Sequence, residues 1–170
     1  MESRGEAPLS DGVVRLRPFR EGDHAIHMAL KWYRDRDVLD GVGGMDEAPY
    51  DEARVGRMYH YLNTHGEVYF IEVNQNGQWL PIGDVTLSPD TTPIVIGDKG
   101  WRSRGIGARV LALLIRRARA LGYTEMWAKE IWAHNVQSQR LFERMGFRRV
   151  EEGRDEKGRT WYRYRLDLTV

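Results

Sequence analysis

Hydrophobic and polar residues alternate along the chain with two periods, one typical of strands and one of helices. Short runs rich in β-branched and aromatic residues predict strands at 11–20, 67–74, 79–88, 94–96, 124–132, 147–152 and 160–168. Apolar residues at helical spacing predict helices at 21–33, 49–65, 105–121 and 135–145. This order of elements predicts an α+β domain with a mixed, mostly antiparallel sheet.

The stretch 35–52 interrupts this pattern and is predicted to be a loop. It contains three glycines, one proline and seven acidic side chains, whereas the nearby cations are Arg34, Arg36 and Arg54. Two interpretations remain open for it. The acids are either an ordinary solvated surface or an acidic lip that attracts a cationic substrate.

Composition limits the possible functions. With 170 residues, 41% of them hydrophobic, the chain can bury a core as a single domain over 11–170, after a polar N-terminus (1–10) that we expect to be disordered. A net charge of +1 gives no general attraction for nucleic acid, and no apolar run or leader predicts a membrane span, so we expect a cytoplasmic protein. The absence of cysteine excludes disulfides, thiolate metal ligands and a cysteine nucleophile. The histidine pairs His24/His27 and His60/His65 lack a third ligand, so no metal site is predicted.

A glycine-rich basic turn joins the strand 94–96 to the helix 105–121. Gly105 and Gly107 allow a close approach of the backbone, and the first N–H groups of a helix have no partner within it. Together with the positive charges of Lys99, Arg102 and Arg104, this turn predicts an anion site suited to a pyrophosphate. It is not a Walker loop, since the required Lys and Ser/Thr are replaced by Ile106 and Gly107. The third glycine of a dinucleotide-binding fingerprint is also missing.

Two motifs resemble those of a known family. Arg102-x-x-Gly105-x-Gly107 resembles the Q/R-x-x-G-x-G/A signature of the GNAT superfamily of acyl-CoA-dependent N-acetyltransferases, and the segment 135–147 is similar to its second motif, N-x-x-[SA]-x-x-[LF]-Y-x-x-x-G-F. The resemblance covers about residues 12–168 and is strongest over 93–150. It implies a GNAT fold with splayed central parallel strands, at 93–97 and 124–132, and about four flanking helices. A weaker resemblance links the chain to the aminoglycoside 6'-N-acetyltransferase and ribosomal-protein acetyltransferase branches.

The resemblance also implies which residues bind acetyl-CoA, the acyl donor. Backbone groups of Val95, Ile96 and Gly97 would pair with the pantetheine arm. The pyrophosphate would lie on the turn formed by Arg102, Ser103, Arg104, Gly105, Ile106, Gly107 and Ala108. Asn135, Ser138 and Phe142 would complete the site, although many relatives have a Tyr in place of Phe142 as the proton donor to the leaving thiolate.

The acceptor amine must be deprotonated before it attacks the thioester directly. For an alkylammonium with a pKa near 10.4, this costs roughly 4–5 kcal/mol at pH 7. A positioned carboxylate is the usual proton acceptor. We favour Asp98, which ends the strand 94–96; the other nearby acids are Asp84, Asp90 and Glu130, and Thr91 occupies the place where several relatives have a glutamate.

The predicted function is therefore transfer of an acetyl group to a primary amine of a small cationic molecule, similar to an aminoglycoside or a polyamine. Two alternatives remain open: a protein N-terminus or lysine as acceptor, and a non-catalytic acyl-CoA-binding module. We expect no nucleic-acid or membrane partner, and either a monomer or a homodimer.

Overall fold

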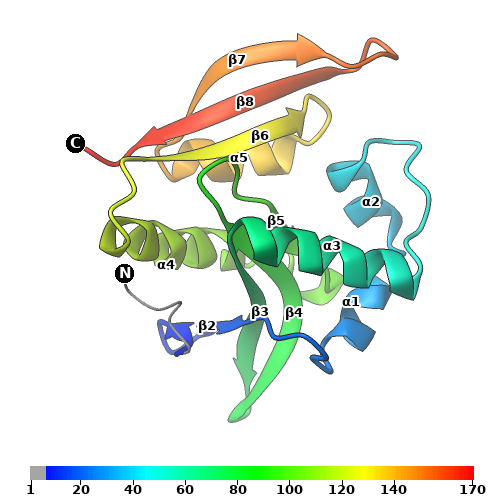
Figure 1. Ribbon diagram of the computed structural model, residues 1–170, viewed down its shortest axis with the longest axis vertical. Helices are drawn as coiled ribbons and strands as arrows, with labels where there is room; N and C mark the ends of the chain where they lie inside the picture. The colour runs from blue at the N-terminus through cyan, green and yellow to red at the C-terminus, as the bar shows by residue number, and fades with distance from the viewer. Residues whose placement is uncertain (1–6) are drawn as a thin grey trace.

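A computed structural model describes residues 7–170, which form two antiparallel sheets and five α-helices (Figure 1). The first sheet has the order β1 (Leu9–Ser10), β2 (Val14–Pro18), β3 (Glu67–Gln75), β4 (Gln78–Leu87) and β5 (Ile94–Ile96). The second has the order β6 (Glu125–Trp132), β8 (Thr160–Asp167) and β7 (Arg148–Arg154). The helices are α1 (Ile26–Trp32), α2 (Arg36–Val42), α3 (Glu52–His65), α4 (Ile106–Ala120) and α5 (Val136–Arg144). None of the helices in this range is long and apolar enough to cross a membrane.

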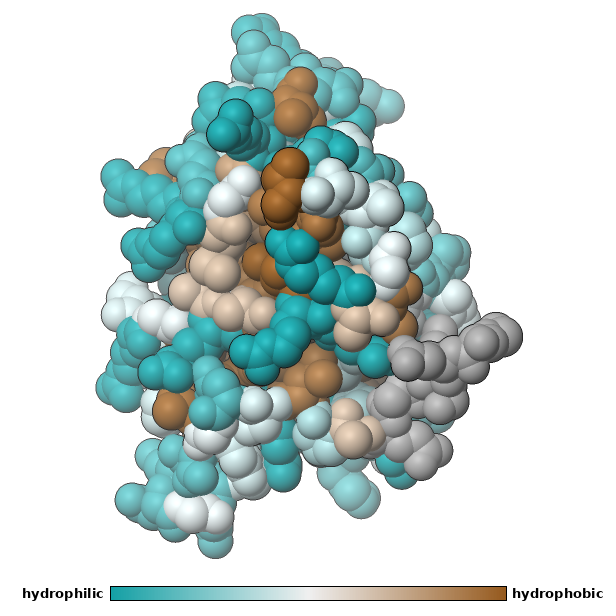
Figure 2. Space-filling model, turned by 90° about the vertical axis from the view of Figure 1, so that its left-hand side faces the viewer, coloured by the Kyte–Doolittle hydropathy of each residue, from teal (hydrophilic) through white to brown (hydrophobic). Residues whose placement is uncertain are grey.

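Helix α4 lies between the two sheets and packs against both (Figure 1). Its apolar positions recur at helical spacing, so Val110, Leu111 and Leu114 are buried on one side. They share one cluster with Val85 of the first sheet and Met126 of the second. Hydrophobic residues also reach the surface at the height of α4, framed above and below by hydrophilic ones (Figure 2). A continuous core therefore holds the two sheets together.

Helices α1 and α3 cover the opposite face of the first sheet. Successive strand residues point to opposite faces, so Tyr69 joins the α4 cluster whereas Phe70 joins a second cluster with Tyr33 and Tyr59. The rings of Tyr59 and Phe70 meet edge to face with centroids 5.4 Å apart. This second core is rich in aromatic side chains and, as described below, contains one buried acid.

The sheets meet at β5 and β6, the edge strands of the two sheets. In the described range no ladder of hydrogen bonds joins these strands. One contact links β6 to the turn before β5: the Lys129 N–H donates to the Thr91 hydroxyl at 3.2 Å, beside a bulge of β6 at which Glu130 has φ +53°. The side of β5 away from β4 is therefore left without a strand partner.

Two sequence predictions differ from the structure. The segment 35–52 is not wholly a loop, because it contains α2, where the carboxylate of Asp35 caps the first turn by accepting from the Asp37 N–H at 2.8 Å. The predicted disorder over 1–10 is wrong for Leu9 and Ser10, which pair with Leu16 and Arg15 as strand β1. Residues 1–6 lie outside the described range.

Candidate functional site

The free side of β5 is defined by its register with β4. Thr86 N–H donates to Pro93 O at 3.0 Å and Gly97 N–H donates to Ile82 O at 2.7 Å, with Val95 opposite Asp84 between them. Hydrogen-bonded and non-bonded pairs alternate in an antiparallel ladder, so the backbone groups of Val95 also face β4. Val95, Ile96 and Gly97 were predicted to pair with the pantetheine arm. Of these three, only Ile96 therefore presents its N–H to the side away from β4.

The turn before α4 has the backbone shape of an anion site. Ser103 has φ +59° and Gly105 has φ +77°, and α4 begins without a side-chain cap. Ser103, Arg104 and Gly105 are all exposed, and a Cβ at Gly105 would meet no atom within 4 Å. The first N–H groups of this 15-residue helix thus have no side-chain cap and follow an exposed turn, which suits a pyrophosphate.

Arg102 lies close to this turn but its side chain points elsewhere. Its Nε donates to Ile96 O at 2.9 Å and its NH2 group to Gly97 O at 3.2 Å. It also pairs with Asp35 at 3.6 Å and with Asp37 at 3.4 Å. Arg102 therefore fixes the end of β5 against the start of α2. Arg104 is an exposed cation of the turn and lies over the Trp101 ring at 4.9 Å.

The other glycines of the site allow close packing. A Cβ at Gly97 would lie 2.0 Å from Trp32 Cγ, and a Cβ at Gly107 would lie 2.8 Å from Leu141 Cδ2. Gly97 thus leaves room for the end of α1, and Gly107 lets α4 approach α5. The side chain of Ile106 is buried in the core, and Ala108 is half-buried.

The residues predicted on the second motif lie at the start of α5. Asn135 caps this helix, since its Oδ1 accepts from the Ser138 N–H at 3.2 Å. Phe142 is 2% exposed, and its ring meets Phe147 edge to face at 5.0 Å. The structure therefore gives Asn135 and Phe142 structural contacts, and their predicted contacts with acetyl-CoA remain predictions.

A protein-family comparison identifies the chain. The model of the acetyltransferase (GNAT) family matches residues 26–147, which span α1 to α5 and include both motifs. The chain belongs to the GNAT acetyltransferase family. It is therefore an N-acetyltransferase with acetyl-CoA as the acyl donor, and its two-sheet architecture is the GNAT fold. A search of curated proteins finds no match.

Solved structures share this fold at low sequence identity. A domain from Methanocaldococcus jannaschii has a TM-score of 0.76 at 20% identity, covering 92% of this chain and 99% of its own. Aminoglycoside acetyltransferase AAC(6')-Ib with coenzyme A has a TM-score of 0.72 at 17% identity, covering 91% and 94%. Spermidine N-acetyltransferase from Vibrio cholerae with CoA and spermine has a TM-score of 0.75 at 14% identity, covering 94% and 98%.

Two acids of this GNAT chain lie beside β5. Asp98, the predicted proton acceptor, uses its Oδ1 to accept from the Gly100 N–H at 2.9 Å and so caps the short 3₁₀ helix Lys99–Trp101. Asp84 of β4 is buried and accepts hydrogen bonds from the hydroxyls of Tyr33 (2.8 Å) and Tyr59 (2.7 Å). Burial raises the pKa of the Asp84 carboxyl to about 6, although both phenol hydrogen bonds lower it. The sequence analysis favoured Asp98 and named Asp84 only as one of the other nearby acids. The feature that could have pointed to Asp84 is that it is the one acid in the mostly apolar strand 79–88.

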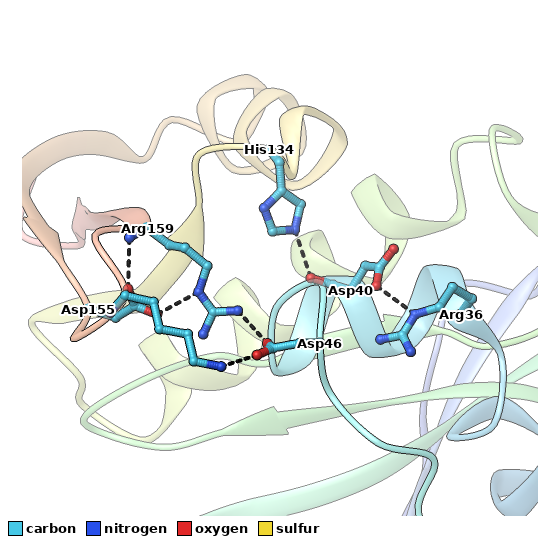
Figure 3. A network of polar contacts seen from close by, with 7 residues as sticks. Arg36, Asp40, Asp46, His134, Asp155 and Arg159 are labelled. Carbon is cyan, nitrogen blue, oxygen red and sulfur yellow. Dashed lines mark hydrogen bonds and ion pairs between the residues drawn. The ribbon is translucent and has the colours of Figure 1, made fainter.

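Residues 35–47, which we call the bridging segment, contact the start of α5 and the β7–β8 hairpin (Figure 3). The Asp40 carbonyl contacts His134 Nε2 at 2.8 Å, beside the cap of α5. Asp46 pairs with Lys157 and Arg159 of the β7–β8 hairpin, and these two cations lower its pKa to about 2. Asp46 is therefore ionised throughout the neutral pH range.

Proposed function

We propose that this acetyltransferase transfers the acetyl group to the primary amine of a small cationic molecule, aminoglycoside- or polyamine-like, which attacks the thioester directly. One observation supports the proposal: the free side of β5 is followed directly by the turn and the uncapped start of α4. The acetyl-CoA pyrophosphate would bind the N–H groups of the turn 103–107, and its pantetheine arm would pair with Ile96.

The bridging segment favours a small acceptor over a peptide. It is tied to the β5–α4 turn through Arg102, to the α5 cap through His134 and to the β7–β8 hairpin through Asp46. A segment fixed at three places leaves less room for an extended peptide chain than for a single amine. Two of the similar structures contain small amines, namely AAC(6')-Ib with ribostamycin and the Vibrio cholerae enzyme with spermine.

The acids of the bridging segment are not a free acidic lip. Asp40 pairs with Arg36, Asp46 with Lys157 and Arg159, and Glu47 with Arg54. Ion pairs within the protein reduce the field that these acids exert on a substrate. The negative charge that recognises an ammonium group must therefore come mainly from elsewhere in the site.

The test is release of CoA thiol from acetyl-CoA in the presence of separate panels of aminoglycosides, polyamines and N-terminal peptides. The chain has no cysteine, so it contributes no thiol to the signal. We expect turnover with at least one small polyamine or aminoglycoside. Turnover with peptides alone would contradict the choice of acceptor, and acetyl-CoA binding without any turnover would favour a binding module.

Replacing Asp46 tests the role of the bridging segment. In Asp46→Asn the side chain keeps its size but loses its charge, so both contacts to the hairpin weaken. We expect KM for the amine to rise about two- to fivefold while the affinity for acetyl-CoA stays the same. Steady-state kinetics and calorimetry measure the two quantities, with the exposed neighbour Glu156→Gln as control. A change in acetyl-CoA affinity alone would place the segment at the donor side instead.

A further inference from the structure

Asp84 differs in its partners from the buried Glu72 and the half-buried Glu67. Glu72 pairs with Arg15 and Arg17, and Glu67 pairs with Arg117. In the described range 7–170, no Arg, Lys or His forms an ion pair with Asp84, which is only 3% exposed. An ionised carboxylate buried without a cation is unfavourable, so such a group calls for an explanation.

The groups that surround Asp84 are neutral at pH 7. Both phenols, Tyr33 at the end of α1 and Tyr59 on α3, donate to the same oxygen, Oδ2. Its register neighbours are Phe70 on β3 and Val95 on β5. Asp23 is a further acid with an effect on this cluster, because its charge acts on Tyr59. Neither phenol uses Oδ1, which is therefore the oxygen that remains to take a proton.

Asp84 lies on β4, next to β5 on the side opposite its free edge, and is linked through Tyr33 to the bridging segment. It is directly opposite Val95, so one strand spacing, about 4.8 Å, separates its backbone from β5. Its partner Tyr33 comes two residues before the bridging segment begins. Tyr50, three residues after that segment ends, also contacts Tyr33. Its N–H donates to Tyr33 O at 3.0 Å, and the two rings are stacked with centroids 5.1 Å apart.

We propose that Asp84 is the counter-ion and proton acceptor for the ammonium group of the acceptor, a role that rests on the proposed function. Oδ1 takes one proton from the ammonium, and the neutral nitrogen then forms the C–N bond to the thioester carbonyl. The C–S bond breaks, a second nitrogen proton goes to the thiolate to give CoA-SH, and the third stays on the amide. The proton on Asp84 returns to solvent. Asp98 retains its capping role.

The test compares three isosteric variants in the thiol-release assay. For Asp84→Asn we expect kcat/KM to fall by about 10²–10⁴ at pH 7, with acetyl-CoA affinity unchanged. The wild-type rate should rise with pH through about 6 and then level off, whereas the variant should keep rising toward the pKa of the amine. Asp98→Asn is the competing candidate, and the exposed acid Glu152→Gln controls for the loss of one charge.

The variant Tyr59→Phe distinguishes a proton acceptor from a purely structural acid, because only a proton acceptor would change the pH dependence of the rate. It removes one phenol that lowers the pKa of Asp84, so the rise in rate should shift to higher pH. The proposal is overturned if Asp84→Asn keeps the wild-type kcat/KM and pH profile, or if the large loss belongs to Asp98→Asn.

If the proposed function itself is wrong, the thiol-release assay gives no signal for the wild type, and a binding measurement is then needed to test Asp84. If the wild type releases no thiol with any amine, calorimetric titration of the CoA-loaded protein with spermine and with n-butylamine decides the role of Asp84. We expect binding to the wild type and at least tenfold weaker binding to Asp84→Asn. Equal affinities, or no binding of either amine to the wild type, would overturn the assignment of Asp84.

Discussion

The variant Gly105→Val is expected to lose acetyl-CoA binding by about a hundredfold or more. Gly105 has φ +77°, a region that β-branched residues almost never adopt, whereas its Cβ position is free of other atoms. The strain therefore comes from the backbone alone. Relieving it turns the first N–H groups of α4 away from the pyrophosphate, and each lost hydrogen bond to a charged group costs about 1.5–3 kcal/mol.

Two further variants separate backbone strain from side-chain packing. Gly105→Asn should keep most of the affinity, because Asn tolerates positive φ. Gly107→Leu should also abolish binding, but through Leu141, which lies 2.8 Å from a Cβ at this position and would push α5 away from α4. Calorimetry gives the affinities, and urea unfolding shows whether each variant is folded. Wild-type affinity in Gly105→Val would contradict the location of the pyrophosphate site.

Asp84→Asn is expected to make the protein more stable at pH 7, by about 1–3 kcal/mol. Burial raises the pKa of Asp84 from 3.8 to about 6, and two pKa units correspond to about 3 kcal/mol. Below about pH 3 the carboxyl is protonated in both the folded and the unfolded chain. Between about pH 4 and pH 6 it ionises first in the unfolded chain, so the stability of the wild type falls as pH rises. Asparagine carries no such penalty.

The difference in unfolding free energy between Asp84→Asn and the wild type should therefore be smallest at pH 4 and largest above pH 6. Urea unfolding at pH 4, 5, 6 and 7 measures this difference directly. A gain in stability combined with a loss of activity is the pattern expected when a buried charge is kept for function. A variant that is less stable than the wild type at pH 7 would show instead that Asp84 serves mainly to hold Tyr33 and Tyr59.

Most of the elements were predictable because their signals are local. The helix 105–121 and the strands 67–74 and 79–88 were predicted within two residues at each end, since their periodicity and glycine ends lie within the segments themselves. Helix α2 was missed because it has only seven residues, two of them acidic and one a glycine, and so lacks an apolar stripe. Its position depends on contacts with Arg102, His134 and the hairpin, which are distant in sequence.

The site was predictable in its motifs but not in its side-chain contacts. The positive φ of Gly105 and the start of α4 follow from the spacing of the glycines. The turn of Arg102 toward Ile96 and Gly97, however, depends on how β5 and α2 are arranged in space. The cluster around Asp84 likewise brings together residues 51 and 25 positions apart in sequence, and no local pattern reveals that both phenols meet one carboxylate.

Residue-resolved amide hydrogen exchange, with and without saturating acetyl-CoA, tests most directly that the donor binds along β5 and the start of α4. The N–H groups of Ile96 and Gly107 should exchange rapidly in the free protein, because neither is part of a ladder or an inner helical turn. We expect their exchange to slow by about tenfold or more when acetyl-CoA binds, while the exposed hairpin 155–158 is unaffected. Bound acetyl-CoA that leaves both amides unchanged and protects a different surface would contradict the proposed site.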